Sequence, residues 1–167
     1  MASRCYVRAG VAAFSFLLVA CAGPAQYYGG SGVHDATAAE VAGDWTNVKG
    51  TRVELHEDGT ASLTKLDGHD FDYDEGWRLS GTGDWRLADT DGGQVVRLAL
   101  KAPTRVDRRP SEATGTPLPS ADTQPPSTYN WSLYVDRSEH KHELKLFFFF
   151  GDPDIGNTYV LTRTAQK

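Results

Sequence analysis

The chain has 167 residues, with 17 Lys and Arg side chains against 22 Asp and Glu, which gives a formal net charge of −5. An acidic balance of this kind argues against nucleic acid as a partner. It also argues against purely electrostatic attachment to anionic lipid headgroups. The length suits one domain with a sizeable hydrophobic core.

The first twenty residues, MASRCYVRAGVAAFSFLLVA, have the layout of a secretory signal peptide. Arg4 and Arg8 form a short positive segment without an acidic residue, and residues 9–20 are small or apolar apart from Ser15. A basic start followed by about a dozen apolar residues is typical of such peptides. The segment is shorter than the ~20 apolar residues that a membrane-spanning helix needs.

The signal-like segment ends in Leu18-Val19-Ala20-Cys21, which resembles the lipobox of bacterial lipoproteins. The resemblance implies that residues 1–20 are removed and that Cys21 carries a diacylglyceryl group. Two acyl chains hold a protein durably on a bilayer. We therefore expect a lipid anchor at Cys21, on the extracytoplasmic side of the cell membrane. The layout is also similar to that of many small actinobacterial lipoproteins, which have no established activity.

The mature chain predicted in this way divides into a tether and a body. Loss of Arg4 and Arg8 leaves 147 residues with 15 basic and 22 acidic side chains, a net charge of −7. Residues 21–39 lack a sustained period and contain Gly29-Gly30-Ser31-Gly32, which predicts a flexible tether. Residues 40–167 form the predicted β domain. Within it, about residues 102–128 carry six prolines and few large apolar residues, which favours a disordered loop.

The body alternates apolar and polar residues with period two, and turn signals separate the alternating segments. Asp58-Gly59 is a strong hairpin signal between residues 51–56 and 61–66. Further strands are expected at residues 76–80 and 84–88, paired across a Gly-Thr-Gly turn, and at residues 95–100, 131–135, 144–150 and 159–161. The pattern predicts an all-β, antiparallel up-and-down barrel or barrel-like meander of about eight strands, with a β-sandwich as the alternative.

The segment Gly43-Asp44-Trp45 opens the first predicted strand and resembles the lipocalin and calycin signature. In that family the Trp closes one end of the barrel and an Arg near the end of the last strand packs over it. The resemblance implies that Trp45 and Arg163 form this closing pair. The chain departs from the family in having no C-terminal helix, no framework disulfide and a long Pro-rich insert.

The acidic run around Asp70, Asp72 and Asp74 is a candidate metal site, because three carboxylates on one face can begin a calcium site. The EF-hand pattern fails, since its Gly position is Glu75 and its final Glu position is Gly81. A solvated acidic turn is the alternative interpretation.

Two groups of aromatic residues are candidates for a ligand or interaction surface. Phe71, Tyr73 and Trp77 are expected at an open mouth of the barrel. Phe147 and Phe149 belong to an unbroken run of four Phe residues, so they lie on the face away from the core. That face needs a cover from the Pro-rich insert or from a partner, or else it is exposed, as interaction surfaces often are.

No catalytic motif is present: the sequence has no nucleophile elbow, phosphate loop or zinc-protease signature. No cofactor is implied. We therefore expect a non-enzymatic, membrane-anchored binding module whose barrel takes a small apolar ligand or an envelope component. The alternative is an envelope protein–protein interaction module without a ligand.

Overall fold

The structure is a computed structural model that describes residues 28–68, 77–108, 127–138, 142–150 and 156–164. Eight strands make up most of it: β1 (Gly43–Thr46), β2 (Arg52–Leu55), β3 (Thr60–Asp67), β4 (Trp77–Thr90), β5 (Gly93–Arg108), β6 (Tyr129–Arg137), β7 (Leu144–Phe149) and β8 (Thr158–Arg163). One short helix, α2 (Ala38–Val41), precedes them.

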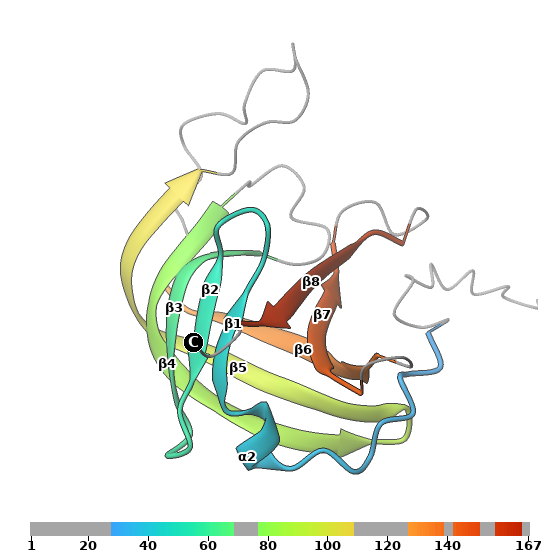
Figure 1. The fold of residues 1–167 in the computed structure, drawn as a ribbon. Helices are drawn as coiled ribbons and strands as arrows, with labels where there is room; N and C mark the ends of the chain where they lie inside the picture. The colour runs from blue at the N-terminus through green and yellow to red at the C-terminus, as the bar shows by residue number, and fades with distance from the viewer. Residues whose placement is uncertain (1–27, 69–76, 109–126, 139–141, 151–155, 165–167) are drawn as a thin grey trace, which may run out of the picture.

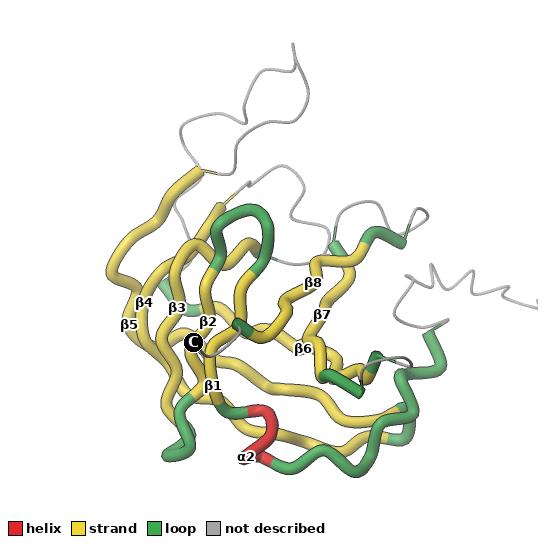
Figure 2. Tube along the Cα trace, in the orientation of Figure 1, coloured by secondary structure: helices red, strands yellow, loops and turns green. Residues whose placement is uncertain are grey.

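Every strand pairs antiparallel with its neighbours in sequence, and β8 returns to β1, so that the sheet closes into a barrel (Figure 1). This confirms the predicted antiparallel barrel and excludes the sandwich. The end at which α2 lies is called the lower end below, and the end at which the Asn47–Thr51 turn lies is the upper end. Strands make up nearly all of the barrel wall, as Figure 2 shows.

Alternation along the strands fills the interior with apolar side chains. On β6, for example, Trp131, Leu133 and Val135 are buried while their neighbours are more exposed. The twelve largest fully buried side chains are Trp45, Trp131, Phe148, Leu55, Leu66, Leu79, Leu98, Leu133, Leu146, Leu161, Val41 and Val53. Large apolar groups therefore meet across the axis of the barrel.

The prediction of a hairpin at residues 76–88 is wrong, because β4 runs unbroken through Gly81 and Gly83. Both glycines sit at register shifts between β4 and β5. A Cβ atom at Gly81 would lie 2.3 Å from the carbonyl oxygen of Ala102, and one at Gly83 would lie 2.0 Å from that of Ala99. The glycines thus allow a close backbone approach at irregular pairing and do not make a turn.

Two segments that the sequence assigns to irregular regions are partly ordered. Residues 102–108, the start of the Pro-rich stretch, continue β5, and residues 109–126 lie outside the described part. Residues 28–37, assigned to the tether, lie along the barrel and lead into α2. A capping box begins this helix, since Thr37 and Glu40 each bond to the other's backbone N–H.

Candidate functional site

Large apolar side chains of the described strands fill the middle of the barrel. Trp45, Leu133 and Leu161 all have no measurable exposure to a water-sized sphere. An internal cavity large enough for water would expose the atoms that line it. Within the described part of the chain, the side chains of these three residues therefore border no such space.

The lower end is closed by Trp45 and Arg163, which are cross-strand partners in β1 and β8. The Trp45 indole N–H donates to the carbonyl of Val41 at 2.9 Å. The Arg163 guanidinium lies over the indole ring, 5.3 Å from its centroid, and donates to the carbonyls of Glu40 and Ala42. The carbonyls at the end of a helix otherwise lack partners. The pair expected from the lipocalin resemblance is thus brought into contact, and it holds α2 against the barrel.

The upper half contains a buried polar network centred on Arg78 of β4. Its guanidinium Nε donates to the Asp67 carboxylate at 2.7 Å, and Nη2 donates to the carbonyl of Lys49 at 3.0 Å and to the Thr51 hydroxyl at 3.2 Å. The Thr51 hydroxyl is also hydrogen-bonded to the hydroxyl of Tyr159. Arg78 and Asp67 are 7% and 3% exposed, so this ion pair lies inside the protein.

Burial raises the pKa of Tyr159 above its usual 10.0, and the negative charge of Asp67 adds to the increase. The hydrogen bond with Thr51, and the hydrogen bond and charge of Arg78, act in the opposite direction, and each is weaker. The phenol therefore stays protonated through the physiological range. The network connects β8 with the β1–β2 turn. It lies at a level of the barrel where β1 and β8 do not pair.

That network stands beside an unpaired strand edge. β1 pairs with β8 only as far as Thr46 and Thr162, and Thr164 N donates to Asp44 O, so even-numbered residues of β8 direct their backbone groups toward β1. Above Thr162, β1 has already turned back at Asn47–Thr51. Within the described residues, the N–H and C=O groups of Val160 and Thr158 therefore face no strand on this side.

Two exposed apolar side chains flank this free edge of β8. Val160 is 38% exposed, and Val48, at the tip of the β1–β2 turn, is fully exposed. The turn is fixed by the Asn47 side chain, which accepts from the backbone N–H of Lys49 at 2.7 Å. The edge of β8 and this tip form one surface at the upper end, named the β8 edge below.

A second surface lies outside β6 and β7, where Tyr28, Tyr134, Phe147 and Phe149 form an aromatic cluster. The Tyr28 ring meets the other three at centroid distances of 5.3–5.7 Å. Tyr134 stacks on Phe147 at 5.3 Å, and the two Phe rings meet edge-on at 5.8 Å. The outward Phe residues are thus covered in part by the segment before the barrel, a cover that the sequence pattern did not single out.

Residues 28–37, called the strap, are held mainly by Gln94 of β5. Its side-chain amide accepts from Ala36 N and donates to Ala36 O, both at 2.9 Å, and its backbone N–H donates to Val33 O at 2.7 Å. Gly32 N donates to Gly92 O at 3.1 Å. A buried amide that hydrogen-bonds to both backbone groups of one residue fixes the strap on the barrel much as a strand pairing would.

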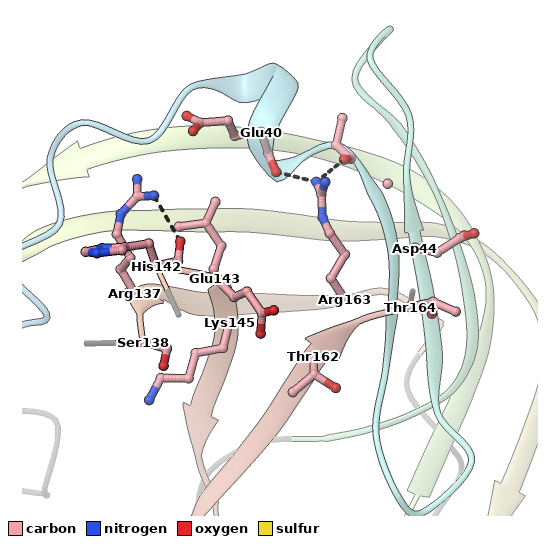
Figure 3. Close-up of a pocket in the computed structure, with 13 residues that line it drawn as sticks. Glu40, Asp44, Arg137, Ser138, His142, Glu143, Lys145, Thr162, Arg163 and Thr164 are labelled. Carbon is pink, nitrogen blue, oxygen red and sulfur yellow. Dashed lines mark hydrogen bonds between the residues drawn. The ribbon is translucent and has the colours of Figure 1, made fainter. Parts of the chain in front are cut away.

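A groove of about 820 Å³ opens at the lower end, with Arg137 and His142 on one side and Arg163 on the other (Figure 3). Glu143 and Lys145 also line it, so charges of both signs alternate along its walls. The Arg137 guanidinium already donates to His142 O and lies 3.4 Å from the Asp35 carboxylate. The groove presents no dominant charge that would select one class of ion.

The remaining predicted site residues fall into two groups. Trp77 begins β4 at the upper end and is half-buried. Cys21, Asp70, Phe71, Asp72, Tyr73 and Asp74 lie outside the described residues. Within the described part, no three His, Cys, Asp or Glu side chains gather as a metal would require. No helix in the described ranges is long and apolar enough to cross a membrane.

The sequence reasoning missed the Arg78–Asp67 pair and the role of Gln94. Asp67 was visible only as part of an acidic run, and Arg78 is a single charge within an alternating strand. A charged residue at a buried position of the period-two pattern was the one available signal.

The fold and the sites define a closed eight-stranded antiparallel barrel with a packed core and two distinct outer surfaces. Comparison with known proteins adds no family name: no protein-family model, no curated protein sequence and no solved structure matches the chain.

Proposed function

We propose that this chain is an extracytoplasmic lipoprotein, anchored through Cys21, whose solid barrel docks another protein of the cell envelope. The anchor rests on the signal-like segment and on Leu18-Val19-Ala20-Cys21. The docking function rests on one structural observation, the edge of β8 that pairs with no strand among the described residues, together with exposed Val48 and Val160.

The packed interior favours docking over the binding of a small apolar ligand. Ligand sites are concave and enclose most of the ligand surface. An eight-stranded barrel is just wide enough either to fill with side chains or to hold one small ligand. Here Trp131, Phe148 and the inward Leu residues take that space. The partner is therefore expected on the outside of the barrel.

The free edge determines how a partner would bind. Val160 and Thr158 offer alternating backbone donors and acceptors, which match an extended polypeptide. Addition of a strand to an exposed edge is a recurring mode of peptide recognition, in which the main-chain hydrogen bonds supply affinity. Exposed Val160 on β8 and exposed Val48 in the β1–β2 turn add apolar surface. An exposed edge that serves no purpose is a liability that proteins usually block with charges or proline.

Palmitate labelling in a Gram-positive host tests the anchor. We expect the wild-type chain to incorporate the label and to fractionate with membranes, and the Cys21→Ala variant to remain unlabelled and soluble. Equal labelling of both chains, or of neither, would contradict the anchor.

Photo-crosslinking in cells tests the docking surface. A benzoylphenylalanine residue replaces Val160 in one variant and the exposed Thr64 of β3 in the matched control. We expect a discrete adduct of higher mass from position 160 alone. A Val160→Lys variant, with the crosslinker moved to position 48, should lose that adduct. Identical patterns from positions 160 and 64 would remove the support for docking at the β8 edge.

A further inference from the structure

We infer that the outer face of β6 and β7, with the aromatic cluster of Tyr28, Tyr134, Phe147 and Phe149, rests on the lipid surface that holds the anchor. The inference depends on the proposed lipid at Cys21 and adds the orientation of the barrel. The partner that we infer for this face is the lipid bilayer itself.

The length of chain between the anchor and the barrel limits the orientation. Tyr28 is fixed on the outer face of β6 and β7 by three ring contacts, and Gln94 holds the strap that follows. Cys21 and Tyr28 are seven positions apart, which gives seven residue steps between their Cα atoms. At the maximum extension of a polypeptide they cover about 25 Å. The face that carries Tyr28 therefore stays near the lipid, whereas the far side of the barrel, at β2 and β3, is turned away.

The chemistry of the cluster suits a lipid–water boundary. Tyr28 and Tyr134 combine an apolar ring with a hydroxyl tip, and Phe149 adds a purely apolar ring. These three side chains are half-buried, so each still presents some surface. Amphipathic aromatic rings concentrate at membrane interfaces because the ring leaves water while the hydroxyl stays hydrated.

The charges around the cluster do not oppose this contact. Exposed Arg97 of β5 donates to the Ser132 hydroxyl, and Lys145 of β7 lies 2.9 Å from the Asp136 carboxylate. Among the described residues, Arg97 and Lys145 thus place positive charge on the strands that carry or adjoin the rings, although the predicted mature chain is acidic. The local balance permits approach to anionic headgroups that the net charge alone would disfavour.

A single-cysteine experiment on the lipidated protein tests the orientation. In the predicted mature chain the only native thiol, that of Cys21, is taken by lipid, so one introduced cysteine can be labelled alone. Ser132→Cys places the label on β6 next to Tyr134, and Ser62→Cys places it on β3 as a matched control. Both serines are half-buried and project outward from the sheet.

Each labelled protein, carrying an environment-sensitive nitrobenzoxadiazole group, is reconstituted into phosphatidylcholine–phosphatidylglycerol vesicles with and without headgroup-quenching lipid. We expect quenching at position 132 to exceed quenching at position 62 by at least about twofold. The reason is that an apolar face at a membrane surface is buried about 5–10 Å into the boundary between headgroups and acyl chains. Phe149→Ser, which removes one ring, should reduce the difference. Equal quenching, or stronger quenching at position 62, would overturn the inference.

Flotation of the same samples separates this inference from the proposed function. Protein that floats with the vesicles and shows equal quenching is anchored but oriented differently, so only the inference fails. Protein that neither floats nor carries lipid by intact mass contradicts the anchor itself. If the label at position 132 is shielded from water in vesicles that lack the quencher, and the protein has the mass of a dimer, a second copy covers the cluster. That result would also overturn the inference.

Discussion

Arg163 of the last strand lies over the indole of Trp45, its cross-strand partner in the first strand, with the guanidinium carbon 5.3 Å from the ring centroid. The same guanidinium binds two carbonyls at the end of α2. One side chain therefore joins the seam of the barrel, the indole and the helix.

Replacement of Arg163 should destabilise the fold moderately. Arg163→Ala loses the cation–π contact and leaves helix carbonyls to water, so we expect the free energy of unfolding to fall by about 1–2 kcal/mol at this exposed site. Arg163→Lys should retain part of the effect, because it keeps a cation over the ring. Denaturant unfolding measures both, with Thr162→Ala on the neighbouring outward position as the control. An Arg163→Ala midpoint equal to wild type would show that the pair contributes nothing.

Removal of one partner of the buried Arg78–Asp67 pair should destabilise the fold far more than removal of both. Arg78→Met leaves the Asp67 carboxylate buried without its guanidinium, which is expected to destabilise by about 3–5 kcal/mol. Adding Asp67→Leu removes the uncompensated charge and should restore part of the loss. Equilibrium unfolding of the wild type, both single variants and the double variant measures the coupling. Additive effects would contradict direct pairing.

Tyr159 should make the barrel less stable in alkali. Because its pKa is raised on folding, the unfolded chain releases the phenolic proton first, near pH 10.0. The unfolded state then binds fewer protons than the folded state, so stability is fully present below that pH and falls as pH rises above it. Unfolding curves between neutral pH and pH 11 measure this slope. Tyr159→Phe should flatten it while losing about 1 kcal/mol at neutral pH through the missing hydrogen bond.

Gln94 should stabilise the strap against local opening but should not stabilise the strands on the far side of the barrel. Gln94→Ala removes both amide contacts with Ala36, so residues 28–37 should exchange amide hydrogens and be cleaved by proteases faster than in wild type. Strands on the far side, such as β3, should keep their protection. Hydrogen-exchange mass spectrometry follows both regions at once, with Thr64→Ala as the control. Uniform loss of protection across the barrel would show that Gln94 supports the core instead.

The packed core should exclude apolar probes until a side chain is removed. Wild-type protein should not bind benzene or 1-anilinonaphthalene-8-sulfonate in its interior, because large apolar side chains such as Trp131, Phe148 and Leu133 fill it. Leu133→Ala should lose about 2–5 kcal/mol of stability and create a dry cavity that accepts benzene. Calorimetry with benzene compares the two proteins. Tight binding of an apolar probe by the wild type would favour the small-ligand function.

Much of the fold follows from local patterns. The alternation in β2, β6 and β8 and in the first half of β3 identifies the inward residues, because side chains on a strand point to opposite faces in turn. The Asp58-Gly59 turn connects β2 and β3 as its composition predicts. The Gly-Thr-Gly segment at residues 81–83 was misleading, since it lies inside β4 and makes no turn. Glycine signals both a turn and a close backbone approach, and only the neighbouring strand distinguishes them.

The sequence by itself determined the all-β class, the approximate number of strands, the inward-facing residues and the pairing partners Trp45 and Arg163 that the lipocalin resemblance implied. Only the tertiary structure decided that Arg78 and Asp67 meet inside the barrel, that Gln94 fixes the strap, that Tyr28 covers Phe147 and Phe149, and that β8 extends beyond β1. The physical reason is the range of the interactions. Alternation and turn chemistry act between near neighbours and leave a mark in the sequence, whereas these contacts join residues far apart in the chain, and their existence depends on strand lengths and register once the barrel closes.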